Sequence, residues 1–121
     1  MADFKGKKVL ITGSTQGIGL EIARQFSQCG AVVFINGAAS EEKINNVVKS
    51  ISNSRPALCD LSNPDCAEIL YEITGDIDIL ILNASIQYRK AWDEISDEEF
   101  DRQIAVNFKS SLKLIQKYVP Y

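Results

Sequence analysis

The chain has 121 residues, of which 45% are hydrophobic and 24% are charged, and its formal net charge is −3. These values are typical of a single globular domain, and the negative charge argues against non-specific nucleic-acid binding. No apolar run approaches the roughly 20 residues that span a bilayer, and the N-terminus lacks the apolar core of a signal peptide, so we expect a cytoplasmic protein without membrane partners.

A glycine-rich stretch ends the first apolar run. Residues 8–19 read KVLITGSTQGIG, in which β-branched residues lead into Thr12 and Gly13, and Gly17 and Gly19 follow. The pattern then changes from strand to helix period, which predicts a strand, a loop and a helix N-terminus. Glycines allow positive φ and close approach of the backbone to a ligand, so the stretch predicts a pyrophosphate site. A plain tight turn is the alternative.

Helices and strands alternate in the rest of the first half. Helical spacing of Ile18, Ile22, Ala23 and Phe26 predicts a helix over residues 17–30, capped by Gly30. The run at residues 31–35 is apolar throughout, which is typical of a strand covered on both faces. A helix is predicted over residues 41–51, and a short strand at residues 55–59 contains a proline, which favours the sheet edge.

The second half continues this alternation. A helix is predicted to open at residues 62–65, with Ala67, Ile69, Leu70 and Ile73 covering the sheet. Residues 77–82 form the most hydrophobic segment and predict a central fourth strand. A capping box of Ser96 and Glu99 begins the last helix. Its buried stripe is predicted to consist of Phe100, Ile104, Phe108, Leu112 and Ile115. Three irregularly spaced cysteines and the absence of histidine predict no disulfide framework and no metal site.

These patterns resemble the short-chain dehydrogenase/reductase family. Its nucleotide loop reads T-G-x-x-x-G-I-G, and residues 12–19 match every fixed position. The resemblance covers essentially the whole chain, but only the first half of a typical member. It implies an α/β fold, a three-layer Rossmann-type doubly wound parallel sheet of which only the first four strands and their helices are present. Residues 1–121 would then be the N-terminal part of a single Rossmann-fold domain.

The resemblance also implies which residues contact a dinucleotide cofactor. They are Gly13, Ser14, Thr15, Gln16, Gly17, Ile18 and Gly19 in the loop, Asn36 and Gly37 at the ribose, Asp60 and Leu61 at the adenine, and Asn83, Ala84 and Ser85 after the fourth strand. The family motif at this last place is N-N-A-G, so Leu82 and Ser85 depart from it, and Asn83 is expected to brace the strand and the loop. Asp60 is alternatively a cap or turn residue.

Cofactor choice depends on the loop after the second strand. By resemblance, NAD-preferring members carry Asp at the position of Gly37. NADP-preferring members carry Arg near Ala38, or Arg or Lys at the position of Gln16. An acid there would hydrogen-bond the ribose 2′-OH and repel a 2′-phosphate. Because this chain has no carboxylate to exclude the phosphate, we predict NADP as the preferred cofactor, with NAD as the alternative.

Two further residues receive roles from the resemblance. Asn107, between Val106 and Phe108, matches the family's catalytic asparagine, which helps to hold a water leading to the active-site lysine. Arg89 lies in a basic-aromatic loop, residues 86–90, that looks like the corresponding segment of sugar-acid and polyol members such as gluconate 5-dehydrogenase. Arg89, or alternatively Lys90, is predicted to bind an anionic substrate group, because guanidinium pairs with carboxylate bidentately. The alternative is a solvated connection.

The family's Tyr-x-x-x-Lys pair and its substrate-orienting serine are missing from the chain. We therefore expect a fragment, inactive alone, of an NAD(P)-dependent oxidoreductase that interconverts a carbonyl and an alcohol by hydride transfer, with a sugar acid or polyol as substrate. The full-length enzyme is expected to be a homo-dimer or homo-tetramer. The alternatives are a 3-oxoacyl-thioester reductase, a complete non-catalytic nucleotide-binding or interaction module, and a sheet domain in which the glycine loop is only a turn.

Overall fold

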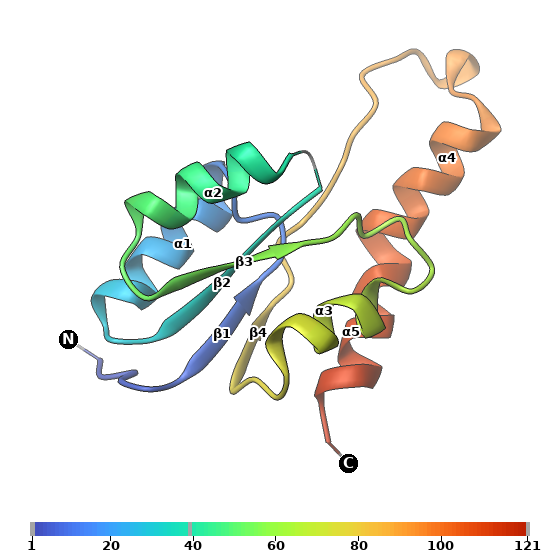
Figure 1. The fold of residues 1–121 in the computed structure, drawn as a ribbon. Helices are drawn as coiled ribbons and strands as arrows, with labels where there is room; N and C mark the ends of the chain where they lie inside the picture. Colours follow the sequence, from blue (N-terminus) through green and yellow to red (C-terminus); the bar gives the residue numbers. More distant parts are fainter. Residues whose placement is uncertain (1, 39, 121) are drawn as a thin grey trace.

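Four parallel strands form the centre of the molecule in a computed structural model that describes residues 2–38 and 40–120. Their spatial order is β3 (Ser54–Leu58), β2 (Val32–Gly37), β1 (Lys8–Ile11) and β4 (Ile79–Ile81) (Figure 1). The helices are α1 (Gly17–Gln28), α2 (Glu41–Ser50), α3 (Cys66–Thr74), α4 (Asp97–Ile104) and α5 (Ser110–Tyr118). A 3₁₀ turn, η1 (Trp92–Glu94), precedes α4, and a π-helical turn, η2 (Ala105–Lys109), joins α4 to α5.

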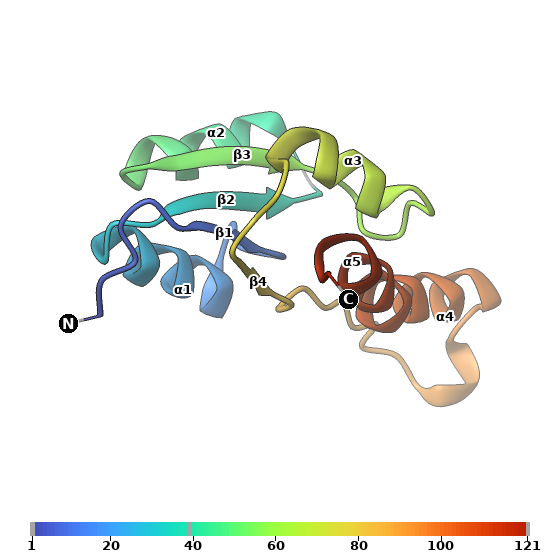
Figure 2. The same cartoon turned by 90° about the horizontal axis from the view of Figure 1, so that it is seen from below.

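The sheet is the middle of three layers. Figure 1 shows α1 and α2 on one side of the strands and α3 and α5 on the other, and Figure 2 shows α3 close to α5. Side chains of β1 alternate between these faces, because successive residues of a strand point to opposite sides. Leu10 packs in a cluster with Leu70 and Leu114, whereas Val9 and Ile11 pack in the cluster on the α1 side. The predicted three-layer α/β fold is therefore confirmed.

The predictions for the two edge strands of the sheet, β3 and β4, have different outcomes. β3 contains Pro56 and, in the part of the chain that the structure describes, pairs with β2 alone, so its predicted edge position is confirmed. The bounds predicted for the fourth strand, residues 77–82, are wrong, whereas the apolar edge expected in the absence of further strands beyond it is observed among the described residues. Only Ile79–Ile81 are in β4, which pairs with β1 alone and is half-buried. The strand has no second neighbour among the described residues, so its apolar side chains cannot be fully covered.

The buried stripe predicted for the last helix is also wrong. Phe100, Ile104, Phe108, Leu112 and Ile115 are all exposed, Phe108 at 72% of its surface. Val106, Ser110 and Leu114 are buried instead and face the sheet. These two sets lie on opposite sides of the helix, because positions 108 and 110 differ by about 200° at about 3.6 residues per turn. Periodicity identified one apolar side but not which side meets the sheet.

Smaller corrections concern α1 and α3. Ile18 does not join the core, since it is 74% exposed, and Ile73 is also exposed. The helix α3 begins at Cys66, because the preceding residues form a turn in which the Asp65 N–H donates to the Asn63 side chain at 2.8 Å. Within the described part of the chain, no helix has the length and apolar character needed to cross a membrane.

Candidate functional site

A cleft of about 350 Å³ opens at the carboxyl ends of the strands. This is the edge of an open parallel sheet at which ligands bind. Twelve of the fourteen predicted cofactor residues line the cleft: Gly13, Thr15, Gln16, Gly17, Ile18, Asn36, Gly37, Asp60, Leu61, Asn83, Ala84 and Ser85. The other two, Ser14 and Gly19, are buried and do not line it. Segments far apart in the sequence therefore meet where the resemblance predicted.

The glycine loop and the first turn of α1 form one wall of this cleft. Gly13 and Gly17 have φ angles of +62° and +61°, which side chains other than glycine rarely adopt. A Cβ on Gly19 would lie 2.4 Å from the Gly13 carbonyl oxygen, so only glycine fits there. Gln16, the N-cap of α1, makes no side-chain capping bond, and the first turn holds no acid. The helix N-terminus is thus open to an anion.

Asn36 and Ser14 hold the base of the glycine loop. The Asn36 side chain, 1% exposed, accepts a hydrogen bond from Gly13 N–H at 3.0 Å and donates to the carbonyls of Ala57 and Cys59 at 3.0 and 3.3 Å. Its backbone N–H donates to Ser14 Oγ at 2.9 Å. The Asn36 side chain therefore joins the ends of three strands, and it has little hydrogen-bonding capacity left for a ligand.

Thr12 and Asn83 bind β4 to the same loop. Thr12 Oγ1 accepts hydrogen bonds from the backbone N–H groups of Asn83 and Ala84 at 2.9 and 3.0 Å. Asn83 Nδ2 donates to the carbonyl oxygens of Thr12 and Gly13 at 3.2 and 3.1 Å. The brace predicted between the fourth strand and the loop is present. A Cβ on Gly13 would lie 2.9 Å from Ala84 Cα, so the two segments are in close contact.

Asp60 and Leu61 form the opposite wall, after β3. Leu61 is buried, and the Asp60 carboxylate accepts hydrogen bonds from the N–H and hydroxyl of Ser62 and from Arg102 at 3.2 Å. Burial raises the pKa of Asp60, but the bonds from Ser62 and Arg102 outweigh it and lower the pKa below its ordinary value of 3.8. Asp60 is thus ionised at neutral pH and fixed in place by Ser62 and Arg102.

Gly37 lies where β2 ends, beside the glycine loop. A Cβ at Gly37 would meet Thr15 Cγ2 at 2.6 Å, which is closer than any real contact. An aspartate, the residue that NAD-preferring members carry here, could be accommodated only if Thr15 moved. The walls at this corner of the cleft are the uncharged residues Gln16, Gly37 and Ala38.

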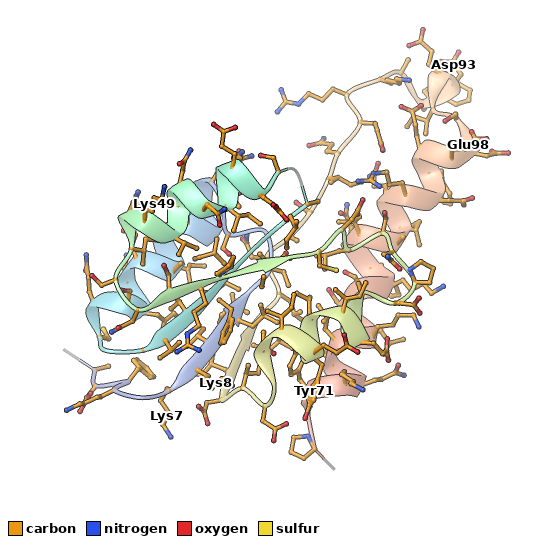
Figure 3. All side chains as sticks on the ribbon, in the orientation of Figure 1. Lys7, Lys8, Lys49, Tyr71, Asp93 and Glu98 are labelled. Atoms are coloured by element: carbon orange, nitrogen blue, oxygen red, sulfur yellow. The ribbon has the colours of Figure 1, made fainter. Side chains whose placement is uncertain are left out.

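The structure does not bring Asn107 and Arg89 into the cleft wall. Asn107, in the π-helical turn η2, exchanges two hydrogen bonds with the backbone of Ile86, accepting at 2.7 Å and donating at 2.8 Å. Ile86 itself lines the cleft, so Asn107 fixes the loop that follows β4. Arg89 is exposed and lies farther along that loop, which extends away from the sheet toward Asp93 and Glu98 (Figure 3). The predicted roles of both residues stay predictions.

Five lining residues were not predicted from the sequence: Ala38, Cys59, Ile86, Arg102 and Val106. Cys59 directly precedes Asp60, so its place at a strand end could have indicated it. Arg102 gave no such indication, because a charged residue on a helix is usually solvated. Burial, together with Cys66 and Asp60, raises the pKa of the Cys59 thiol to about 11, so this thiol is not a nucleophile at neutral pH.

The lining therefore suits binding better than proton transfer. Its ionisable side chains are Cys59, a protonated thiol, and Asp60 and Arg102, which are paired with each other. Among residues 2–38 and 40–120, no group of three acidic, histidine or cysteine side chains is arranged to hold a metal ion. Backbone amides at a helix N-terminus, strand ends and a fixed carboxylate together define a nucleotide-binding domain of the Rossmann type.

The chain belongs to the short-chain dehydrogenase family, whose model matches residues 7–121. It is 34% identical to the 3-oxoacyl-[acyl-carrier-protein] reductase FabG of Rickettsia prowazekii, over 97% of this chain and 52% of the relative. L-Sorbose reductase from Gluconobacter frateurii, solved with NADPH and L-sorbose, has a TM-score of 0.88 at 25% identity, over 98% of this chain and 48% of that one.

A third similar protein is the landomycin C-6 ketoreductase LanV, solved with NADP and rabelomycin. Its TM-score is 0.84 at 31% identity, over 95% of this chain and 53% of that chain. The present chain thus spans about half the length of the relatives that it matches.

Proposed function

We propose that the protein is an NADP-preferring oxidoreductase that interconverts a carbonyl and an alcohol by hydride transfer, and that this chain forms the cofactor-binding half of the active site. The observation that carries the proposal is the open N-terminus of α1. Gln16 provides no cap, the first turn has no acid, and Gly13 and Gly17 allow the backbone to approach a ligand. Such a terminus suits the pyrophosphate of a dinucleotide.

The remaining lining residues fit the rest of the cofactor. Asp60 and Leu61 would hold the adenine, Gly37 would face the ribose, and Asn83, Ala84 and Ser85 would lie toward the nicotinamide. The bound cofactor would supply the hydride. Thr12 and Asn83 would keep the loop and the end of β4 in fixed register during this chemistry. Asn107 would keep the backbone of Ile86 in place at the far side, and we propose for it the water-holding role that the family implies.

Two observations support NADP over NAD. Among the described residues, the corner at Gly37 has no carboxylate that would repel a 2′-phosphate, and one introduced at Gly37 would require Thr15 to move. The L-sorbose reductase and LanV, two similar proteins, were solved with NADPH and NADP. We infer that the same cofactor binds here.

We further propose a sugar acid or polyol as the substrate. The similarity to a reductase solved with L-sorbose supports this class, and Arg89 is the residue proposed to meet an anionic substrate group. A 3-oxoacyl thioester is the second candidate, and the similarity to a 3-oxoacyl-[acyl-carrier-protein] reductase favours it.

We also propose a homo-dimer or homo-tetramer. The exposed apolar side of α4, η2 and α5 includes Phe100, Phe108 and Leu112, and large apolar residues gathered on one surface favour a protein interface. Two copies could cover this side against each other, as expected for the family.

The test uses the complete protein that carries these residues. Purified protein is given NADPH or NADH with L-sorbose, a keto sugar acid, or an acetoacetyl thioester, and loss of the reduced cofactor is followed by absorbance. We expect faster turnover with NADPH and with the sugar substrates. A thioester preference would favour the second candidate. Binding of NADPH without turnover of any carbonyl would contradict the enzymatic proposal and favour a non-catalytic nucleotide-binding module.

Arg89 is tested in the same assay. Arg89→Ala is expected to raise KM for the keto sugar acid while leaving KM for neutral L-sorbose unchanged. An unchanged KM for the acid would remove Arg89 from the proposal without affecting the rest.

A further inference from the structure

Lys43 reaches from α2 to the glycine loop. Its Nζ donates to Gln16 Oε1 at 2.7 Å, although the two residues are 27 positions apart. Gln16 lines the cleft together with Gly37 and Ala38, so the ammonium group lies at the corner where the loop and the end of β2 meet. No sequence pattern distinguishes Lys43 from the other exposed charges on this amphipathic helix.

The charge of Lys43 is not neutralised by a carboxylate. No acidic side chain in residues 2–38 and 40–120 lies within 4.0 Å of its ammonium group. The contact with Gln16 is with a neutral amide oxygen, so the charge remains available to an anion. The backbone of Lys43 is fixed as well, because its N–H donates to the Oγ of Ser40, the N-cap of α2, at 3.1 Å.

Two glutamates share the first turn of α2 with Lys43. Glu41 lines a separate hollow with Pro56 and Leu58, against β3 and away from the glycine loop. Glu42 is exposed and is not among the lining residues of the cleft. On the facing wall, Gly37 carries no side chain, and a Cβ at that position would lie 2.6 Å from Thr15 Cγ2. Among the residues that the structure describes, this corner therefore holds one cation and no lining carboxylate.

We propose that Lys43 and Gln16 together form the receptor for the 2′-phosphate of NADP, which rests on the proposed function. Lys43 supplies the positive charge, and the Gln16 side-chain amide supplies a hydrogen-bond donor beside it. A charge-assisted bond from an ammonium to a phosphate is strong enough to distinguish NADP from NAD, which has a hydroxyl at that position. The positive charge that distinguishes NADP from NAD thus lies on α2, because neither Gln16 nor Ala38 carries a charge.

The test is a titration of the complete protein with NADPH and with NADH, followed by the cofactor's fluorescence. Loss of the contact in Lys43→Ala should weaken NADPH binding about tenfold, the value of one charge-assisted bond at an exposed site, and leave NADH binding unchanged. Raised salt should weaken NADPH binding to the wild type more than to Lys43→Ala, because salt screens exposed charges. The double variant Lys43→Ala with Gln16→Arg should recover NADPH binding.

The matched control is Lys49→Ala. Lys49 lies in the last turn of the same helix, at the end away from the cleft (Figure 3). Its removal changes the net charge equally and should leave both affinities unchanged. Glu42→Gln should strengthen NADPH binding slightly, because it removes a negative charge from the same turn.

Each result bears on a distinct claim. NADPH binding that is equally strong in the wild type and in Lys43→Ala would overturn this inference and leave the proposed function intact. Equal losses of NADPH and NADH affinity would also overturn it, since a general disturbance of the cleft would then explain the effect. Failure of the wild type to bind either cofactor would contradict the proposed function, and this inference with it.

Discussion

Replacing Gly19 by alanine tests whether the glycine loop is packed as closely as the site requires. The added Cβ would lie 2.4 Å from the Gly13 carbonyl oxygen and 2.6 Å from Asn83 Nδ2. The first of these is a backbone atom, so the loop itself must move. The same movement strains the hydrogen bond from Asn83 Nδ2 to the Gly13 carbonyl, which is 3.1 Å long.

The size of the effect follows from three contributions. Overpacking costs about 1–3 kcal/mol, and loss of one hydrogen bond costs about 1 kcal/mol. Alanine is the better helix former by about 1 kcal/mol, which offsets part of this cost. We therefore expect Gly19→Ala to lower the free energy of unfolding by about 1–3 kcal/mol, measured by urea unfolding with circular dichroism. NADPH affinity should fall as well, because the displaced loop forms the proposed pyrophosphate site.

Gly6→Ala is the control for this substitution. Gly6 has a φ of +78°, but no atom lies within 4 Å of the position of its Cβ. The variant should lose about 1 kcal/mol through backbone strain alone and bind NADPH as the wild type does. The reasoning would be refuted if Gly19→Ala were as stable as the wild type with unchanged NADPH affinity.

Three other predictions concern the scaffold around the cleft. Asn36→Ala should lower the free energy of unfolding by about 2–4 kcal/mol, since it leaves buried backbone groups unpaired; a loss below 1 kcal/mol in urea unfolding would contradict this. Because the pKa of Asp60 lies below 3.8, its ionised form stabilises the fold above that pH and the contribution is lost as pH falls through the lowered pKa. Arg102→Ala removes one cause of the lowered pKa of Asp60, so the midpoint of acid unfolding, followed by circular dichroism, should move to higher pH. An unchanged midpoint would contradict a stabilising ion pair between Arg102 and Asp60. Phe108→Asp should reduce the oligomer to monomers in analytical ultracentrifugation with little change in stability, because the side chain is 72% exposed, and an unaltered mass would argue against this interface.

The fold was predictable because its determinants are local. Apolar runs at residues 8–11 and 31–35 fix two buried strands, and the glycine spacing fixes the turn between β1 and α1. The side of the last helix that packs on the sheet was not predictable. That helix is apolar on two opposite sides, and only the competition for the sheet selects Val106 and Leu114 over Phe108 and Leu112.

The candidate site likewise contains some residues that could be predicted from the sequence and others that could not. Residues at strand ends, such as Asp60 and Asn83, could be assigned because parallel strands bring their carboxyl ends to one edge. Arg102 and Lys43 could not, since each reaches its partner across a long stretch of sequence, Asp60 in one case and Gln16 in the other. A charged residue on an amphipathic helix shows its role only when tertiary structure places a partner within reach.

The most direct measurement of the central claim is a crystal structure of the complete protein with NADP bound. We predict the pyrophosphate on the first turn of α1 at Gly17 and Ile18, and the adenine beside Asp60 and Leu61. A nucleotide bound elsewhere, or crystals grown at saturating NADP that show an empty cleft at the carboxyl ends of the strands, would contradict the account.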